Sequence, residues 1–240
     1  MVETFVSPDS AARWTKGLLL ATLALSIVGI GSGLLQIELL SRAASGGISD
    51  AEAAANDERQ QVVGVLQTIA YIGTAAAFLV WFRRAHRNLP ALGGRELKYT
   101  SGWAVGAFFV PFLNLVRPLQ VMREVWHASD PTGLERDTSA SGPSVRNELG
   151  TPSLVGWWWA FFLISHFLGN MIARMAFSEN RTIDELQTFS ALLCLSDVLD
   201  VPATLVALVL IGRISNWQDQ RAARIAQGAT ATAQAHGSGA

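Results

Sequence analysis

Two aspartates and a histidine fall within apolar stretches of this 240-residue chain, where ionisable side chains are costly. Asp197 and Asp200 are three residues apart, so a helix would place both on one face. His166, Asn170 and Arg174 recur at every fourth position and would share a face of the preceding helix. If the two helices pair antiparallel, their rise per residue sets His166 opposite the aspartates. Such a cluster could carry protons or a cation, and the alternative is ordinary hydrogen bonding between helices.

A second group of polar residues is basic and lies near the ends of apolar stretches. Arg84 and Asn88 follow one such stretch, and Asn114, Arg117 and Glu124 come from a later segment. Guanidinium and amide groups suit phosphate oxygens, and each basic side chain near a membrane attracts anionic head groups by about 1 kcal/mol. These five residues are candidates for binding a lipid or a small anion. The alternative is that the basic residues only orient the chain in the membrane.

Sequence motifs for catalysis and for metal binding are absent. The chain has no Walker phosphate loop, no GxSxG nucleophile elbow and no HExxH zinc motif. Its single cysteine, Cys194, excludes a disulfide framework, and its four histidines are too scattered to predict a metal or haem site. We therefore expect a protein that is not an enzyme and that uses no cofactor or metal. The net charge of -1 gives no indication of a nucleic-acid partner.

Four long apolar runs must position these polar groups. Half of the residues (50%) are hydrophobic and 15% are charged, and a helix of about 20 apolar residues crosses the hydrocarbon of a bilayer. We predict an all-α integral membrane bundle with four transmembrane helices over residues 17–40, 62–82, 153–176 and 189–212. The first run exceeds the apolar part of a secretory signal, so we expect it to remain as a span.

A shorter apolar segment over residues 102–116 is interrupted by Pro111. Because proline breaks a helix and the segment is short for a span, we predict a re-entrant or interfacial element there, followed by an amphipathic helix over residues 118–128. A fifth, kinked span is the alternative. Four spans would collect most of the lysines and arginines on one side, whereas five would divide them evenly. The positive-inside rule therefore favours four spans in an inner membrane, with both termini in the cytoplasm.

The remaining segments predict no second domain. Residues 1–228 would form one membrane domain, with a mobile cytoplasmic loop over residues 129–152 and a disordered tail over residues 229–240. Thr182 and Glu185 have the spacing of a capping box, which predicts a helix start. Gly29 and Gly33 have GxxxG spacing, which favours close helix packing within the bundle or a homo-oligomer through these glycines.

Motif residues in the centre of the chain resemble those of a known family. They are Trp81-Phe-Arg-Arg84-Ala-His-Arg-Asn88, then Pro111-Phe-Leu-Asn114-Leu-Val-Arg117-Pro118, then Met122-Arg-Glu124-Val-Trp126. These runs resemble the signature of a bacterial membrane family catalogued as a domain of unknown function, the one numbered 4328. The resemblance implies a multi-pass protein of the bacterial inner membrane and supplies no activity. It directs attention to Arg84, Asn88, Pro111, Asn114, Arg117 and Glu124.

Two functional hypotheses follow from these patterns. The leading one is a non-enzymatic membrane protein whose basic, Trp-rich cytoplasmic face binds anionic lipid head groups or a protein partner. The rival is an ion or proton transporter or channel that uses the intramembrane cluster of His166, Asn170, Asp197 and Asp200. The first would depend on the basic residues, and the second would depend on the aspartates.

Overall fold

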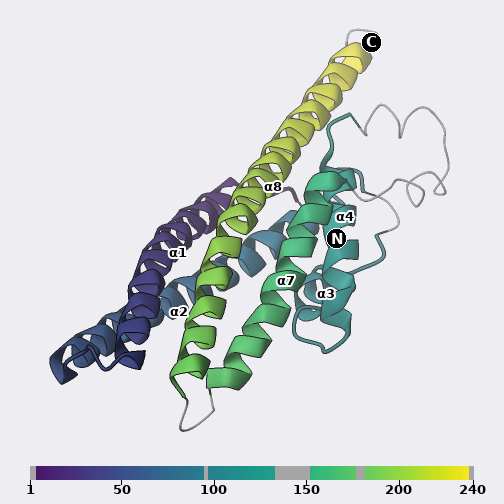
Figure 1. Cartoon of the computed structure of the whole chain (residues 1–240). Coiled ribbons are helices and arrows are strands. Elements are labelled where there is room, and N and C mark those ends of the chain that lie inside the picture. The colour runs from purple at the N-terminus through teal and green to yellow at the C-terminus, as the bar shows by residue number, and fades with distance from the viewer. Residues whose placement is uncertain (1–3, 95–96, 133–151, 177–181, 238–240) are drawn as a thin grey trace. The chain divides into compact units, whose positions relative to one another are not determined.

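The part of the chain that the computed structural model describes, residues 4–94, 97–132, 152–176 and 182–237, forms only helices and turns. The helices are α1 (Asp9–Ala44), α2 (Asp50–Arg87), α3 (Ser101–Gly106), the 3-10 helix η1 (Leu113–Leu115), α4 (Arg117–Ser129), α7 (Ser153–Ala176) and α8 (Ile183–Gly237) (Figure 1). Four of these helices, α1, α2, α7 and α8, are long and apolar enough to cross a membrane. The prediction of an all-α membrane protein with four transmembrane helices is confirmed.

The long helices extend beyond the apolar runs that predicted them. Helix α8 continues to Gly237, so residues 229–237 are helical, which corrects the prediction of a disordered tail there. The reason is composition, because alanine and glutamine are good helix formers even where no apolar face is present. Residues 133–151 of the predicted loop 129–152 lie outside the described residues.

Capping boxes begin two of the long helices. Thr182 N donates to Glu185 Oε2 over 2.8 Å, and Glu185 N donates to Thr182 Oγ1 over 3.3 Å, as the sequence predicted. Ser49 and Glu52 make the same pair of bonds before α2, at 2.9 and 3.3 Å. The pKa of Glu52 is lowered to about 2, chiefly by the hydrogen bond from the Ser49 backbone N–H and to a smaller extent by the hydrogen bond from the Arg42 side chain. The turn between α1 and α2 is thereby fixed by polar contacts.

The helices divide into two compact units. Unit 1 contains Met1–Lys16, Ala77–Gly156 and Val209–Ala240, and unit 2 contains Gly17–Ala76 and Trp157–Leu208. Each long helix therefore has residues in both units, whereas α3, η1 and α4 belong to unit 1 alone.

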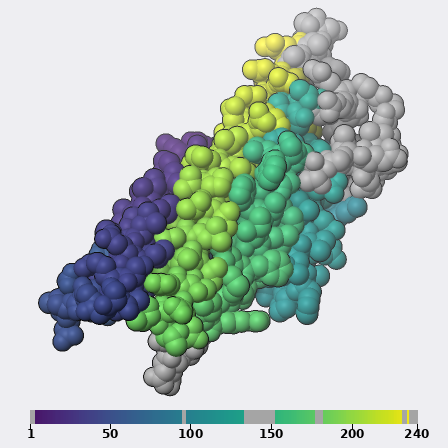
Figure 2. Space-filling model, in the orientation of Figure 1, coloured from purple at the N-terminus to yellow at the C-terminus, as the bar shows by residue number. Residues whose placement is uncertain are grey.

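Small residues of α1 allow close packing in unit 2. A Cβ atom at Gly29 would collide with the side chains of Asp197 and Gln67, and one at Gly33 would collide with Cys194 Sγ. Within unit 2, the parts of α1 and α8 run alongside each other in Figures 1 and 2, in agreement with these contacts. The GxxxG motif thus serves packing within the chain. A homo-oligomer through Gly29 and Gly33 stays a prediction, and these internal contacts weigh against it.

The core of unit 1 is built from α2, α4 and the later part of α8. Its largest fully buried apolar side chains are Trp81, Phe82, Leu89, Leu92, Val121, Met122, Leu210, Ile211 and Ile214. Trp81 Nε1 donates to Ser215 Oγ over 3.0 Å, which satisfies the polar atom of that buried ring. Helix α4 covers the predicted amphipathic helix 118–128 and buries Met122 and Trp126.

The broken segment 102–116 does not form a fifth membrane-crossing helix. Helix α3 ends at Gly106, and η1 has only three residues. Between them, Phe112 adopts a φ of 64°, in the left-handed region that bulky residues rarely occupy. Among the described residues only α1, α2, α7 and α8 qualify as spans, which agrees with the prediction of a broken element.

Candidate functional site

An asparagine at the end of α2 holds the N-terminal segment in place. Asn88 is 2% exposed, and its amide pairs with both backbone groups of Val6: Oδ1 accepts from N over 3.1 Å, and Nδ2 donates to O over 2.8 Å. One turn earlier, Arg84 Nη1 donates to Ser10 Oγ over 2.8 Å. These contacts fix the start of α1 beside the end of α2 within unit 1.

Gln218 of α8 completes the network at Asn88. Its Oε1 accepts from Asn88 Nδ2 over 2.9 Å, and its Nε2 donates to Ala85 O over 2.8 Å and to Ser129 Oγ over 3.0 Å. All N–H donors of both amides are thus used inside the protein. A buried network that is fully satisfied is rigid. Asn88, a predicted ligand-binding residue, therefore acts here by positioning its neighbours.

The joined ends of α1 and α2 carry five basic side chains, which we call the basic rim: Arg13, Lys16, Arg83, Arg84 and Arg87. Three are exposed, and the other two are half-buried. Arg13 pairs with Asp9 at 3.2 Å, but both side chains are more than half exposed, so the pair adds little stability. Trp14 lies between two of these residues and is 76% exposed. Exposed tryptophan beside basic residues is typical of the head-group region of a membrane.

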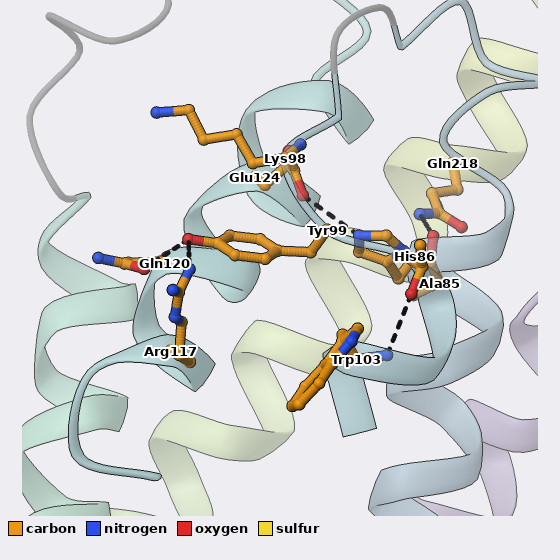
Figure 3. Close-up of polar contacts among 10 residues, drawn as sticks. Ala85, His86, Lys98, Tyr99, Trp103, Arg117, Gln120, Glu124 and Gln218 are labelled. Atoms are coloured by element: carbon orange, nitrogen blue, oxygen red, sulfur yellow. Dashed lines mark hydrogen bonds and ion pairs between the residues drawn. The ribbon is translucent and has the colours of Figure 1, made fainter. Parts of the chain in front are cut away.

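Glu124 of α4 connects α2 to the segment that precedes α3 (Figure 3). Its Oε2 lies 3.2 Å from His86 Nε2, and its Oε1 accepts from Lys98 N over 2.7 Å. His86 is 2% exposed, and its Nδ1 has no hydrogen-bond partner in the described part of the chain. Glu124, another predicted ligand-binding residue, therefore has a bridging role.

Tyr99 and Arg117 flank the broken segment 102–116 and bond to each other, which holds its two ends together (Figure 3). Arg117 Nη1 donates to Tyr99 Oη over 2.6 Å, and Tyr99 Oη donates to Gln120 Oε1 over 2.6 Å. The guanidinium carbon also lies 5.0 Å from the centre of the Tyr99 ring, within cation–π range. Arg117 makes no other hydrogen bond with the described residues, and the side-chain amide of Asn114 makes none. Both groups retain donors that an anion could use.

Comparison with known proteins shows which family the chain belongs to. The family described as Domain of unknown function (DUF4328) matches residues 44–216, about three-quarters of the chain. The chain belongs to this family. No curated protein and no solved structure matches the chain.

The family region covers α2, α3, η1, α4, α7 and α8 as far as residue 216. It contains Arg84, Asn88, Asn114, Arg117 and Glu124, all the predicted residues of the basic site. Two residues that hold Asn88, Val6 and Gln218, lie outside it. The resemblance seen in the sequence is therefore confirmed, while part of the Asn88 network belongs to flanking segments.

The two aspartates of α8 face α1 and α2 within unit 2. Asp197 Oδ1 accepts from Gln67 Nε2 over 2.8 Å, and Asp200 Oδ2 accepts from Ser26 Oγ over 3.5 Å. Gln67 Nε2 also lies 3.4 Å from the backbone oxygen of Leu25. Both carboxylates therefore take their hydrogen bonds from other helices of the unit, which supports their role in packing.

His166 does not join the aspartates, contrary to the prediction from helix rise. It is bonded within its own helix, where Asn170 Nδ2 lies 3.3 Å from His166 Nε2 and 2.8 Å from His166 O. The described residues contain no hydrogen bond or ion pair between His166 and either aspartate, and no group of three or more potential metal ligands. Rise alone sets the height of two facing residues and leaves the rotation of each helix undetermined. The intramembrane cluster that the transport hypothesis would use is therefore Asp197 and Asp200 with their partners Gln67 and Ser26, without His166.

Sequence reasoning missed several partners that the structure brings together. Gln67 had a usable signal, because it is a polar residue inside the apolar run 62–82. Val6, Gln218 and Tyr99 had none, since each lies in a polar or mixed stretch and acts through a distant segment. Such contacts depend on tertiary structure and leave no local pattern.

Proposed function

We propose that this protein is a non-enzymatic, multi-pass protein of the bacterial inner membrane that binds anionic lipid head groups at its basic rim. The observation that carries the proposal is the joining of the ends of α1 and α2 by Asn88 and Arg84. This joining gathers five basic side chains and the exposed Trp14 at the ends of two membrane helices.

The basic rim has the chemistry and the depth that head groups require. Its residues flank the apolar runs 17–40 and 62–82, so they lie where a bilayer changes from hydrocarbon to phosphate. A guanidinium can bind a phosphate through two parallel hydrogen bonds. Because the buried amides already fix the two helix ends, little further ordering is needed on binding.

The distribution of charge supports a cytoplasmic position for the rim. The opposite ends of α1 and α2 meet at an acidic turn that carries Asp50, Glu52, Asp57 and Glu58. Basic residues accumulate on the cytoplasmic side of membrane proteins, where the leaflet surface is also negative. We therefore place the N- and C-termini in the cytoplasm.

The double variant Arg83→Gln/Arg84→Gln is expected to bind phosphatidylglycerol about 30-fold more weakly than the parent protein. The reason is the loss of two surface charges worth about 1 kcal/mol each. The purified full chain, in a zwitterionic detergent, is titrated with phosphatidylglycerol and, separately, with phosphatidylcholine. Native mass spectrometry measures the lipid that is bound. Phosphatidylcholine binding should be the same in both proteins.

The matched control is Arg42→Gln/Arg174→Gln, which removes the same charge at exposed positions outside the rim. Its affinity for phosphatidylglycerol should equal that of the parent. Equal affinities of the rim variant and the parent would contradict lipid binding at the rim. Retention of lipid affinity together with loss of a co-purifying acidic protein would assign the rim to a protein partner.

A further inference from the structure

The broken segment of unit 1 exposes a group of large apolar side chains, which we call the apolar tip: Trp103, Phe109, Phe112 and Val116. Phe112 is 84% exposed and Phe109 is 71% exposed, the highest values among the exposed large apolar residues apart from Trp14. Exposed large apolar side chains concentrated in one short segment mark a candidate site of interaction. Their exposure in a described part of the chain requires an explanation.

The inner side of the same segment packs on the apolar part of α2. The ring of Phe108 lies edge-on to Phe78 at 6.1 Å and to Phe82 at 5.9 Å. Ala104 and Ala107 of the segment are also buried. Phe78 and Phe82 belong to the apolar run 62–82, which crosses the membrane. The segment therefore lies beside α2 at the depth where that run meets the membrane surface.

The backbone of the segment can enter hydrocarbon, because successive tight turns satisfy its polar groups. Backbone N–H groups bonded to a carbonyl oxygen within the segment are those of Ala104, Ala107, Phe108, Phe109, Leu113, Asn114, Leu115 and Val116. Unsatisfied backbone groups are the main obstacle to placing irregular structure in a bilayer. The internal hydrogen bonds of this segment satisfy many of its backbone N–H groups, so insertion into hydrocarbon would leave few of them without a partner.

The base of the segment is polar, in contrast to its tip. The Tyr99, Arg117 and Gln120 bonds close the two arms, and Glu124 holds the backbone of Lys98 (Figure 3). Arg117 follows Val116 directly, so a basic side chain stands next to the apolar tip. An apolar tip above a polar, basic base is the pattern of a monotopic membrane insertion.

We propose that residues 100–116 form a wedge that is inserted into one leaflet of the bilayer, with lipid acyl chains covering the apolar tip. Arg117 and Tyr99 lie at the level of the head groups. Lipid is the occupant because the wedge packs through Phe108 on Phe78 and Phe82 of α2, whose apolar run lies in the bilayer. This inference goes beyond the proposed function, since the wedge would be inserted whether or not the basic rim binds anionic lipid.

The test uses a depth-sensitive fluorophore at single cysteines in a Cys194→Ala background, with one full-length protein per lipid nanodisc. Phe112→Cys and, independently, Phe109→Cys report on the wedge. Ile27→Cys, at an exposed position of the apolar run 17–40, is the lipid-facing reference, and Gln227→Cys, at an exposed position of α8, is the aqueous reference. Quenching is measured with lipids that carry a nitroxide on the acyl chain and with iodide in the buffer.

The expected result is that labels at 112 and 109 match the Ile27→Cys reference, with strong nitroxide quenching and several-fold weaker iodide quenching than at Gln227→Cys. Labels that match the aqueous reference at both positions would overturn the wedge. Protection from iodide that appears only with two proteins per nanodisc would overturn it as well, because the occupant would then be a second copy. Neither result would depend on phosphatidylglycerol affinity at the rim, so the two proposals can fail separately.

Discussion

Replacement of Gly29 by valine is expected to destabilise the protein by about 3 kcal/mol or more. A Cβ atom at this position would collide with the side chains of Asp197 and Gln67, and Asp197 Cγ would lie only 2.9 Å away. Forcing extra carbon into a packed site costs about 1–3 kcal/mol, and breaking the Gln67–Asp197 hydrogen bond adds about 1 kcal/mol or more. The measurement is the melting temperature of the purified protein in detergent, with tryptophan fluorescence as the signal for unfolding.

Gly31→Val is the matched control for this prediction. It lies two residues along the same helix, receives the same β-branched side chain, and has no heavy atom within 4 Å of its Cβ position. Its melting temperature should remain close to that of the parent protein. If Gly29→Val and Gly31→Val lose the same stability, the close packing of α1 against α8 described for unit 2 is wrong.

The substitution Asn88→Ala is expected to cost about 2–4 kcal/mol and to release the N-terminal segment. It leaves the buried Gln218 Oε1 without its partner, which costs about 1–3 kcal/mol, and it removes two part-buried hydrogen bonds to Val6 that contribute about 1 kcal/mol in total. The melting temperature measures the loss of stability. Limited proteolysis near Val6 measures the release of the segment.

Asn170→Ala provides the comparison for Asn88→Ala. Asn170 is exposed and, among the described residues, hydrogen-bonds to His166 alone, in its own helix, so its removal should have little effect. Because the rim depends on the joined ends of α1 and α2, Asn88→Ala should also weaken phosphatidylglycerol binding without removing a charge. Stability and proteolysis equal to those of Asn170→Ala would show that the Asn88 network does not hold the rim.

The spans were predictable because the apolar runs are long and uninterrupted, and the broken segment because Pro111 divides a short run. The capping box at Thr182 and Glu185 was predictable from spacing, since both partners lie within one turn. The helical tail was missed because the prediction weighed low hydrophobicity over the helix propensity of alanine. These features are local, and local patterns are what a sequence records directly.

The contacts of the site depend on how the helices are rotated, which spacing does not determine. Asp197 and Asp200 were correctly placed on one helix face, but that face is directed towards Gln67 and Ser26. Gly29 contributes to this rotation, because the space left by its missing side chain admits Asp197. In the same way, Asn88 was correctly singled out, whereas its pairing with Val6 could not be read from the sequence.

The side of the membrane on which unit 1 lies is the central claim, and cysteine labelling tests it most directly. Single cysteines replace Gln227, in the C-terminal part of α8, and Glu58, beyond the acidic turn, in a Cys194→Ala background; both positions are exposed. A membrane-impermeant thiol reagent is applied to intact cells and to inside-out vesicles. We predict that Glu58→Cys is labelled in intact cells and that Gln227→Cys is labelled only in inside-out vesicles. Labelling of Gln227→Cys in intact cells would contradict four spans with a cytoplasmic basic rim.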